Sequence, residues 1–178
     1  KGYRELIHAI NILNRSKYSI CLTLYTAIHS SNLSKVHFEE LKVLINSLKL
    51  SKCIKLDSHY YADTEILTNL SKQDLIIFPY QTSNESSSAS VRHGLAAGPP
   101  VLVTPVSIFD DLQDVVHSFS GTSSEEIANG IKTWLENFQN NKNFHHKSQN
   151  WRKQHRFSLL GRRLQGLIRG LELNQEFL

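Results

Sequence analysis

The stretch DLIIFPYQTSNESSSASVRHGLAAGPPVLVT, residues 74–104, decides the fold of this chain. It opens with a mostly apolar, β-rich run that Pro79 closes, which predicts a buried strand. Residues 85–97 are predicted to form a helix, because Gly98 and the two prolines after it supply a C-cap and a stop. A second strand over 101–104 follows at once, so the stretch predicts a strand–helix–strand unit with parallel strands.

The same alternation extends outward in both directions. Apolar residues at helical spacing or in β-rich runs predict helices over 3–15, 38–48, 63–70 and 123–138, and strands over 18–25, 53–56 and 115–119. Parallel strands require crossover helices that cover both faces of the sheet. We therefore predict an α/β fold with a Rossmann-like, doubly wound parallel sheet. A polar linker at 140–143 and a final helix near 156–172 follow it.

Composition limits the class of protein. The chain has 178 residues, 40% apolar and 20% charged, which predicts one globular domain and excludes collagen-like or wholly disordered chains. The longest apolar runs are far shorter than the roughly 20 residues of a membrane-spanning helix. Cys21 and Cys53 lie in strand-like segments without metal-ligand spacing, so we expect free, buried thiols in a reducing compartment. The helical pattern starts directly after Lys1-Gly2, which we interpret as the opening of an excised fragment.

Positive charge is concentrated near the C-terminus. The formal net charge is +4, and eight basic residues lie between Lys142 and Arg169 with no Asp or Glu among them. This basic segment fits a solvated helix face, or a surface that meets anionic lipid or a lipid-diphosphate acceptor. Nucleic acid is disfavoured as a partner, because exposed aromatic residues are not interleaved with the basic ones.

Polar residues gather at the junction between the strand over 74–79 and the helix after it. In open α/β sheets, ligands bind at the carboxyl ends of strands, where helix N-termini present unpaired amides. The small residues over 81–89 would let an anion approach these amides, while Glu85 accepts hydroxyl hydrogens from a polyol. The alternative is structural, since Asn84, Glu85 and the serines are all good helix caps.

The motif ESSSASVRHGLAAGPPV over residues 85–101 resembles the donor-site signature of family-4 (group 1) GT-B glycosyltransferases. That signature is a Glu, seven residues, a second Glu, then small residues, a Gly and Pro-Val. Residues 74–80 are similar to the strand that precedes the signature, and Lys1-Gly2 is similar to the opening of the family's first helix in this half. The resemblance covers about residues 1–138. It implies a Rossmann-like nucleotide-sugar-binding domain from the C-terminal half of a larger, retaining enzyme.

The resemblance implies roles for individual residues in the donor site. Lys1 matches the lysine that neutralises the donor diphosphate, a task that suits a flexible ammonium. Glu85 matches the first glutamate of the signature, the catalytic position near the transferred sugar. The backbone contacts to sugar and phosphate fall on the serines that follow it: Ser86, Ser87 and Ser88.

His93 stands where the family has the glutamate that binds the nucleotide ribose. An imidazole can hydrogen-bond a diol, with a different geometry and pH dependence, or it can simply pack on the helix face. Arg92 beside it can pair with phosphate or remain an exposed helix residue. In the family, the turn matching 57–61 recognises the base through its backbone. His59 and Tyr60 are therefore the candidate base-binding residues, with core packing as the alternative for the tyrosines.

The resemblance also implies a reaction and its setting. The full enzyme would transfer a hexose from a nucleoside diphosphate sugar to a saccharide or lipid-linked acceptor, without cofactor or metal. Surface polysaccharide synthesis in the bacterial cytoplasm, peripheral at the inner face of the membrane, is the usual setting. Residues 139–178 would form a helical tail that packs toward an N-terminal domain of the same enzyme, leaving the helix near 156–172 partly uncovered here. The fragment alone would bind donor and transfer nothing.

One other interpretation of the chain stays open from the residues. A noncatalytic regulatory or interaction module could keep the Rossmann-like fold after losing the chemistry, and His93 is its best support. Asp110, Asp111 and Asp114 imitate an aspartate-rich Mg²⁺ motif, but without a second such motif they are better interpreted as helix-capping residues.

Overall fold

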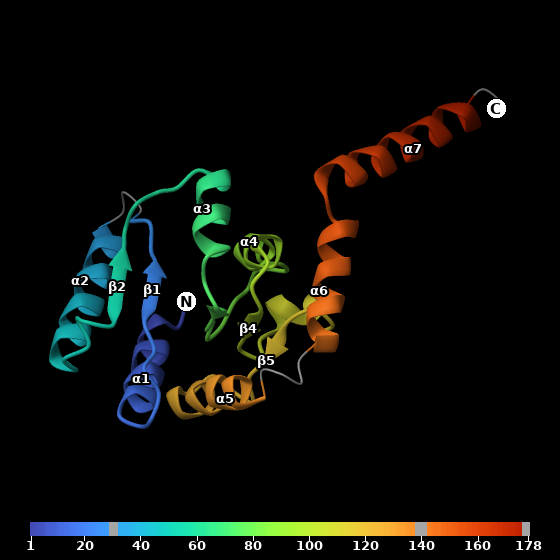
Figure 1. Ribbon diagram of the computed structural model, residues 1–178. Helices are drawn as coiled ribbons and strands as arrows, with labels where there is room; N and C mark the ends of the chain where they lie inside the picture. Colours follow the sequence, from blue (N-terminus) through green and yellow to red (C-terminus); the bar gives the residue numbers. More distant parts are fainter. Residues whose placement is uncertain (29–31, 138–141, 176–178) are drawn as a thin grey trace.

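The structure is a computed structural model, and it describes residues 1–28, 32–137 and 142–175. Helices and strands alternate along it (Figure 1). Their order is α1 (Tyr3–Asn14), β1 (Leu22–Tyr25), α2 (Asn32–Ser47), β2 (Ile54–Asp57), α3 (Asp63–Leu70), β3 (Ile76–Phe78), α4 (Ala89–Ala97), β4 (Val101–Val103), the 3-10 helix η1 (Ser107–Leu112), β5 (His117–Ser118), α5 (Ser124–Glu136), α6 (Lys142–Gln154) and α7 (Phe157–Gln175).

All strand pairs in the described residues are parallel, as predicted. β1 pairs with β2, with Leu22 opposite Ile54. β4 lies between β3 and β5, with Ile76 of β3 opposite Val101. The strands thus form two groups, in the orders β1-β2 and β3-β4-β5, rather than one continuous ladder.

The residues of β4 show that helices cover both faces of its sheet. Leu102 is buried in one apolar cluster, with residues of α1, α2 and α5. Val101 and Val103 are buried in the other cluster, with residues of α4 and η1. Because successive side chains of a strand point to opposite faces, this division confirms the doubly wound α/β class.

The first cluster is centred on α1 and α5, which pack together. Leu6, Ile7 and Ile10 of α1 are almost completely buried, and so is Ile127 of α5. α5 begins at a capping box in which Ser123 and Glu126 bond reciprocally, as the sequence predicts. These contacts position α1, which begins two residues after Lys1.

The C-terminal segment differs in part from the prediction. The polar linker expected at 140–143 ends earlier, because α6 already begins at Lys142; residues 140 and 141 lie outside the described part. α6 packs on α4, and Trp151 contacts the second apolar cluster. α7 extends away from the body (Figure 1), and its apolar side chains are exposed, as expected: Leu164, Leu167 and Leu171 among them.

Two smaller predictions are tested by the fold. Both cysteines are free, but Cys21 is exposed and Cys53 half-buried, so the expectation of buried thiols is wrong. The reason is that β1 begins only at Leu22, which leaves Cys21 in the segment before the ladder. Within the described ranges, no helix is long and apolar enough to cross a bilayer.

Candidate functional site

The candidate site lies at the carboxyl ends of the strands, where α1 begins. Lys1 and Gly2 lie beside the end of β3, and a Cβ on Gly2 would come within 1.6 Å of the Pro79 carbonyl oxygen. Gly2 also has a φ of 75°, so this close approach needs glycine. The aromatic ring of Tyr3 lies 6.4 Å from that of His37 in α2, which follows β1. The start of α1 is thereby held near the ends of both β1 and β3.

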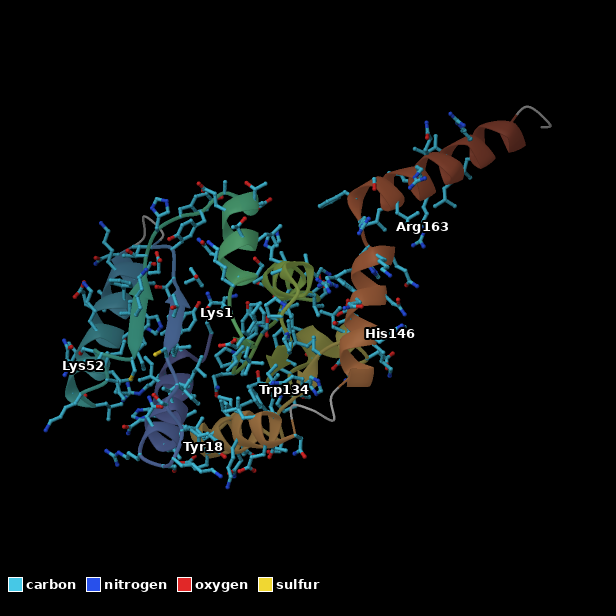
Figure 2. The ribbon with its side chains drawn as sticks, viewed as in Figure 1. Lys1, Tyr18, Lys52, Trp134, His146 and Arg163 are labelled. Atoms are coloured by element: carbon cyan, nitrogen blue, oxygen red, sulfur yellow. The ribbon has the colours of Figure 1, made fainter. Side chains whose placement is uncertain are left out.

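An aromatic partner holds the ammonium of Lys1, the residue whose place is labelled in Figure 2. Its Nζ donates a hydrogen bond of 2.6 Å to the hydroxyl of Tyr80 and lies 4.1 Å from the centre of that ring. Tyr80 itself is buried against Phe109, with ring centres 5.2 Å apart. A positive charge therefore lies directly beside the first residues of the loop that leads from β3 to α4.

The loop from Gln81 to Ser88 is longer than the sequence predicts. The helix expected over 85–97 begins only at Ala89, so Glu85 lies three residues before the N-cap rather than beside the helix. Ser88 is the N-cap, and its hydroxyl accepts the Val91 N–H at 3.4 Å. Ser83 accepts the Glu85 N–H at 3.2 Å, and such local bonds compete with a helical start.

Because α4 begins late, several residues of the predicted site are exposed to solvent. Glu85, Ser86 and Ser87 are exposed, whereas Ser88 is buried at the start of the helix. The exposed segment follows Tyr80, the partner of Lys1, by a few residues. Along the chain, the loop leads from Tyr80, the partner of the Lys1 ammonium, past the exposed Glu85 carboxylate to the N-terminus of α4. These groups suit a ligand that carries both phosphate and hydroxyl groups.

Arg92 is paired within the protein. Its guanidinium forms an ion pair with Asp111 of η1 and donates a 2.9 Å hydrogen bond to the Ser88 carbonyl oxygen.

The interpretation of the aspartates near residue 110 as helix caps is wrong, because η1 begins after Val106 and the Asp110 carboxylate accepts a hydrogen bond from the Gln113 side-chain amide instead. In the ranges that the structure describes, no group of three or more His, Cys, Asp or Glu residues could hold a metal ion.

His93 faces a carboxylate that the sequence pattern does not point to. Its Nε2 lies 3.8 Å from an oxygen of Asp63, the first residue of α3, and α3 packs on α4. Both side chains reach solvent, with His93 43% and Asp63 82% exposed. In the sequence, Asp63 resembles an ordinary first-turn acid, and only the packing of the two helices reveals the pair.

Asp57 organises the turn after β2 through hydrogen bonds, and one aromatic ring of the turn is exposed. Asp57 accepts hydrogen bonds from the His59 N–H at 3.1 Å and from the Tyr61 hydroxyl at 2.9 Å. Burial raises the pKa of Asp57, but these bonds and Lys55 outweigh it and hold the pKa below its usual value. Tyr60 is 82% exposed, so core packing is wrong for this ring, and it could stack on a base.

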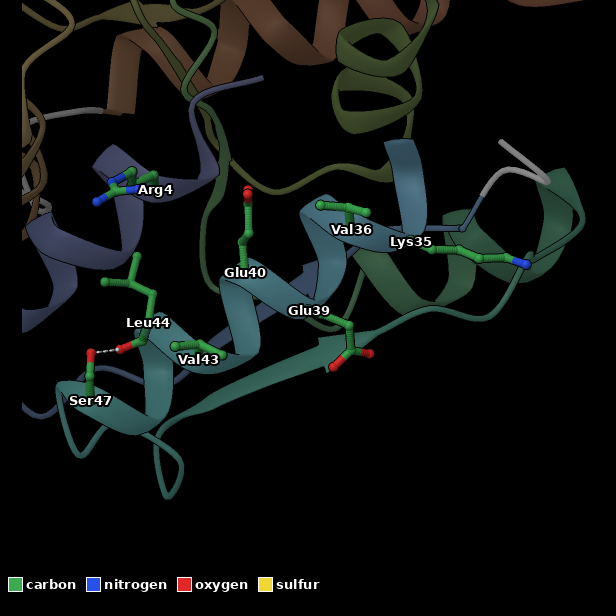
Figure 3. Close-up of a pocket in the computed structure, with 8 residues that line it drawn as sticks. All are labelled: Arg4, Lys35, Val36, Glu39, Glu40, Val43, Leu44 and Ser47. Atoms are coloured by element: carbon green, nitrogen blue, oxygen red, sulfur yellow. Dashed lines mark hydrogen bonds between the residues drawn. The ribbon is translucent and has the colours of Figure 1, made fainter. Parts of the chain in front are cut away.

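A separate groove runs along α2 (Figure 3). Its volume is about 730 Å³, and it is lined mainly by α2 side chains together with Arg4 of α1. Val36 and Val43 give it an apolar floor, with Glu39 and Glu40 beside them. None of the residues predicted from the sequence to bind donor lies in this groove.

The chain resembles several solved structures. A glycosyltransferase from Rickettsia africae ESF-5 is 18% identical, with a TM-score of 0.68 over 84% of this chain and 40% of that one. HepE from Anabaena, in complex with UDP-glucose, is 19% identical, with a TM-score of 0.71 over 86% and 41%. The C-terminal domain of the group 1 glycosyl transferase LpcC from Francisella tularensis is 15% identical, with a TM-score of 0.66 over 86% and 76%.

These likenesses confirm the predicted fold class. The chain has the α/β fold of the C-terminal domains of GT-B glycosyltransferases, and it spans less than half of the Rickettsia and Anabaena chains. No protein-family model and no curated protein sequence matches it.

Proposed function

We propose that this chain is the donor-binding domain of a retaining, family-4 glycosyltransferase that takes a nucleoside diphosphate sugar. The observation that carries the proposal is the placement of Lys1 beside the loop that contains Glu85. The fold supports it, because structures with the same fold include complexes with UDP and with UDP-glucose. The cation proposed for the diphosphate would then lie beside Tyr80, a few residues before the carboxylate proposed for the sugar.

Each group would have one task in donor binding. The Lys1 ammonium and the amides at the start of α4 stabilise the negative charge of the diphosphate, most strongly as it leaves. Glu85 accepts hydrogen bonds from hydroxyls of a hexose, and the backbone of Ser86, Ser87 and Ser88 contacts sugar and phosphate. His93 binds the ribose diol, and Asp63 opposite provides a carboxylate near the place where the family has its second glutamate.

The remaining parts of the proposal concern the whole enzyme. Residues 1–138 would hold the donor, and residues 139–178 would pack against an N-terminal domain through the exposed apolar face of α7. That domain would bind the saccharide or lipid-linked acceptor and close the cleft. Because catalysis needs both reactants in one water-excluded geometry, the isolated fragment would bind donor without transferring sugar. Bacterial surface polysaccharide synthesis in the cytoplasm, at an anionic membrane surface, is the proposed setting.

Calorimetry tests the donor site with a matched pair of variants. UDP, GDP, ADP and TDP and their hexose conjugates are titrated into the wild type, Glu85→Gln and Glu136→Gln. Glu136 lies at the far end of α5, where glutamine can still accept the Tyr18 hydroxyl bond, so this variant is the control. Glu85→Gln should lower the affinity for the nucleotide sugar about tenfold, as expected for the loss of a charged hydrogen bond, and leave the affinity for the bare nucleotide unchanged.

Two results would contradict the proposal. If no nucleotide binds the wild type while the fold is intact, the noncatalytic module becomes the better interpretation. If both glutamine variants lower the affinity for the nucleotide sugar equally, Glu85 does not contact the sugar specifically.

A further inference from the structure

The loop from Gln81 to Ser88 is held at both ends, while most of the residues between them are exposed. Just before its start, the Tyr80 carbonyl oxygen accepts a hydrogen bond of 2.5 Å from the hydroxyl of Thr104, the residue after β4. The Tyr80 ring also packs on Phe109 of η1. At its other end, Ser88 is buried as the N-cap of α4. The two ends therefore limit where the exposed residues of the loop can lie.

The Arg92 side chain holds the end of the loop. Its Nη1 donates a hydrogen bond of 2.9 Å to the Ser88 carbonyl oxygen, one helical turn back along α4. A cation in the first turns of a helix is unfavourable, because it lies near the positive end of the helix dipole. The ion pair between Nη2 and the Asp111 carboxylate offsets this effect and keeps the guanidinium at the Ser88 carbonyl oxygen.

Asp111 belongs to a short helix that is itself well anchored. Three other residues of η1 are almost completely buried: Ile108, Phe109 and Leu112. Phe109 packs on Tyr80 at the start of the loop. Asp111 reaches the end of the loop through Arg92. η1 therefore acts on both ends of the loop that carries the candidate sugar-binding carboxylate.

We propose that Asp111 is a positioning residue of the donor site, an inference that rests on the function proposed above. Asp111 orients the Arg92 guanidinium, which holds the Ser88 carbonyl oxygen and so fixes the first turn of α4. The amides of that turn are the groups that would bind the donor diphosphate. Exposed ion pairs contribute little to folding stability, and this pair is 35% and 51% exposed. Its loss should therefore change donor affinity clearly and the Tm only weakly.

The sign of the effect separates positioning from simple electrostatics. Removal of a carboxylate near an anion-binding site should by itself strengthen anion binding, because one negative charge is lost. If Asp111 positions α4, its removal should weaken binding instead. Asp110 offers a matched control, because it is the adjacent, exposed carboxylate, and asparagine at its place can still accept the Gln113 amide bond.

Calorimetry with UDP and with inorganic diphosphate tests the proposal in four variants of this chain. Asp111→Asn and Arg92→Lys should each lower the affinity for both ligands about fivefold, the equivalent of one net hydrogen bond. Lysine is expected to fail because a single ammonium does not reproduce the planar, two-sided contact of a guanidinium. Asp110→Asn should leave the affinity unchanged or slightly higher. Asp111→Glu restores the carboxylate and should recover most of the lost affinity.

Hydrogen exchange and thermal unfolding of the same variants complete the test. Without ligand, the Val91 amide, which bonds the Ser88 hydroxyl, should exchange faster in Asp111→Asn than in Asp110→Asn. The Tm values of these two variants should lie close to that of the wild type.

Four results would overturn the proposal. Equal affinities for Asp111→Asn and Asp110→Asn would show that the ion pair does not position the site. Tighter binding by Asp111→Asn than by Asp110→Asn would show that Arg92, once released, binds phosphate itself. A large fall in the Tm of Asp111→Asn would assign the pair to folding. Absence of nucleotide binding by a folded wild type would remove the proposed function as well, so the two failures are distinguishable.

Discussion

Gly94→Ala measures how closely α4 must approach β3. A Cβ at this position would lie 2.8 Å from Cε2 and 3.1 Å from Cζ of the Phe78 ring, and 3.4 Å from Ile76. Overpacking of this kind costs about 1–3 kcal/mol, whereas replacing glycine by alanine within a helix returns about 1 kcal/mol. The free energy of unfolding should therefore fall by up to about 2 kcal/mol.

Gly161→Ala is the matched control for this prediction. It makes the same chemical change within α7, where a Cβ meets no atom within 4 Å. Thermal unfolding followed by circular dichroism should give an unchanged or slightly higher Tm for Gly161→Ala. The Tm of Gly94→Ala should be lower by roughly 2–4 °C for each kcal/mol lost. Equal Tm values for the two variants would refute the close packing of α4 on β3.

Three further predictions concern stability. Ser123→Ala should lower the free energy of unfolding by about 1 kcal/mol in urea titrations, because the α5 cap is lost. Hydrogen bonds from the Ser123 hydroxyl and backbone hold the pKa of Glu126 below its usual 4.5. The stability that these bonds to the carboxylate contribute should therefore be complete above pH 4.5, and it should disappear as the pH falls through the lower pKa of the folded state. Burial lowers the His117 pKa from 6.5 to about 4, so the unfolded chain binds the proton first as the pH falls. The free energy of unfolding should therefore decrease between pH 6.5 and pH 4. His117→Gln should flatten this pH dependence, and an unchanged slope would contradict the prediction. Ile127→Ala, at a fully buried site, should cost about 2–5 kcal/mol by the same titration, and a loss below 1 would contradict the packing of α5 on α1.

Sequence patterns predicted the fold well where local chemistry decides the structure. The range of α3 matches its prediction, and the capping box of α5 lies at the expected residues. The crossover unit around β3 and β4 follows from apolar runs and a helix stop, signals that need no tertiary information. Strand ends were less predictable, because hydrogen-bonded pairing shortens an apolar run such as 18–25 to the four residues of β1.

The sequence predicts that the site includes a loop before α4, but it does not predict which side chains pair with those of the site. The sequence predicts that the serine-rich loop enters its helix at Glu85, yet Ser88 caps the helix later, after a local bond from the Glu85 N–H to the Ser83 hydroxyl. The pairing of Arg92 with Asp111, and of His93 with Asp63, depends on how α4 meets η1 and α3. α6 lacks an apolar stripe in its sequence, and only contacts such as that of Trp151 explain why it packs.

A crystal structure with bound nucleotide sugar tests the central claim most directly. The chain would be crystallised with the conjugate that binds most tightly in calorimetry. We predict the diphosphate within hydrogen-bond distance of the Lys1 ammonium, and sugar hydroxyls within that distance of the Glu85 carboxylate. A ligand bound in the groove beside Val36 and Val43, or at the carboxyl edge without contact to either Lys1 or Glu85, would contradict the account.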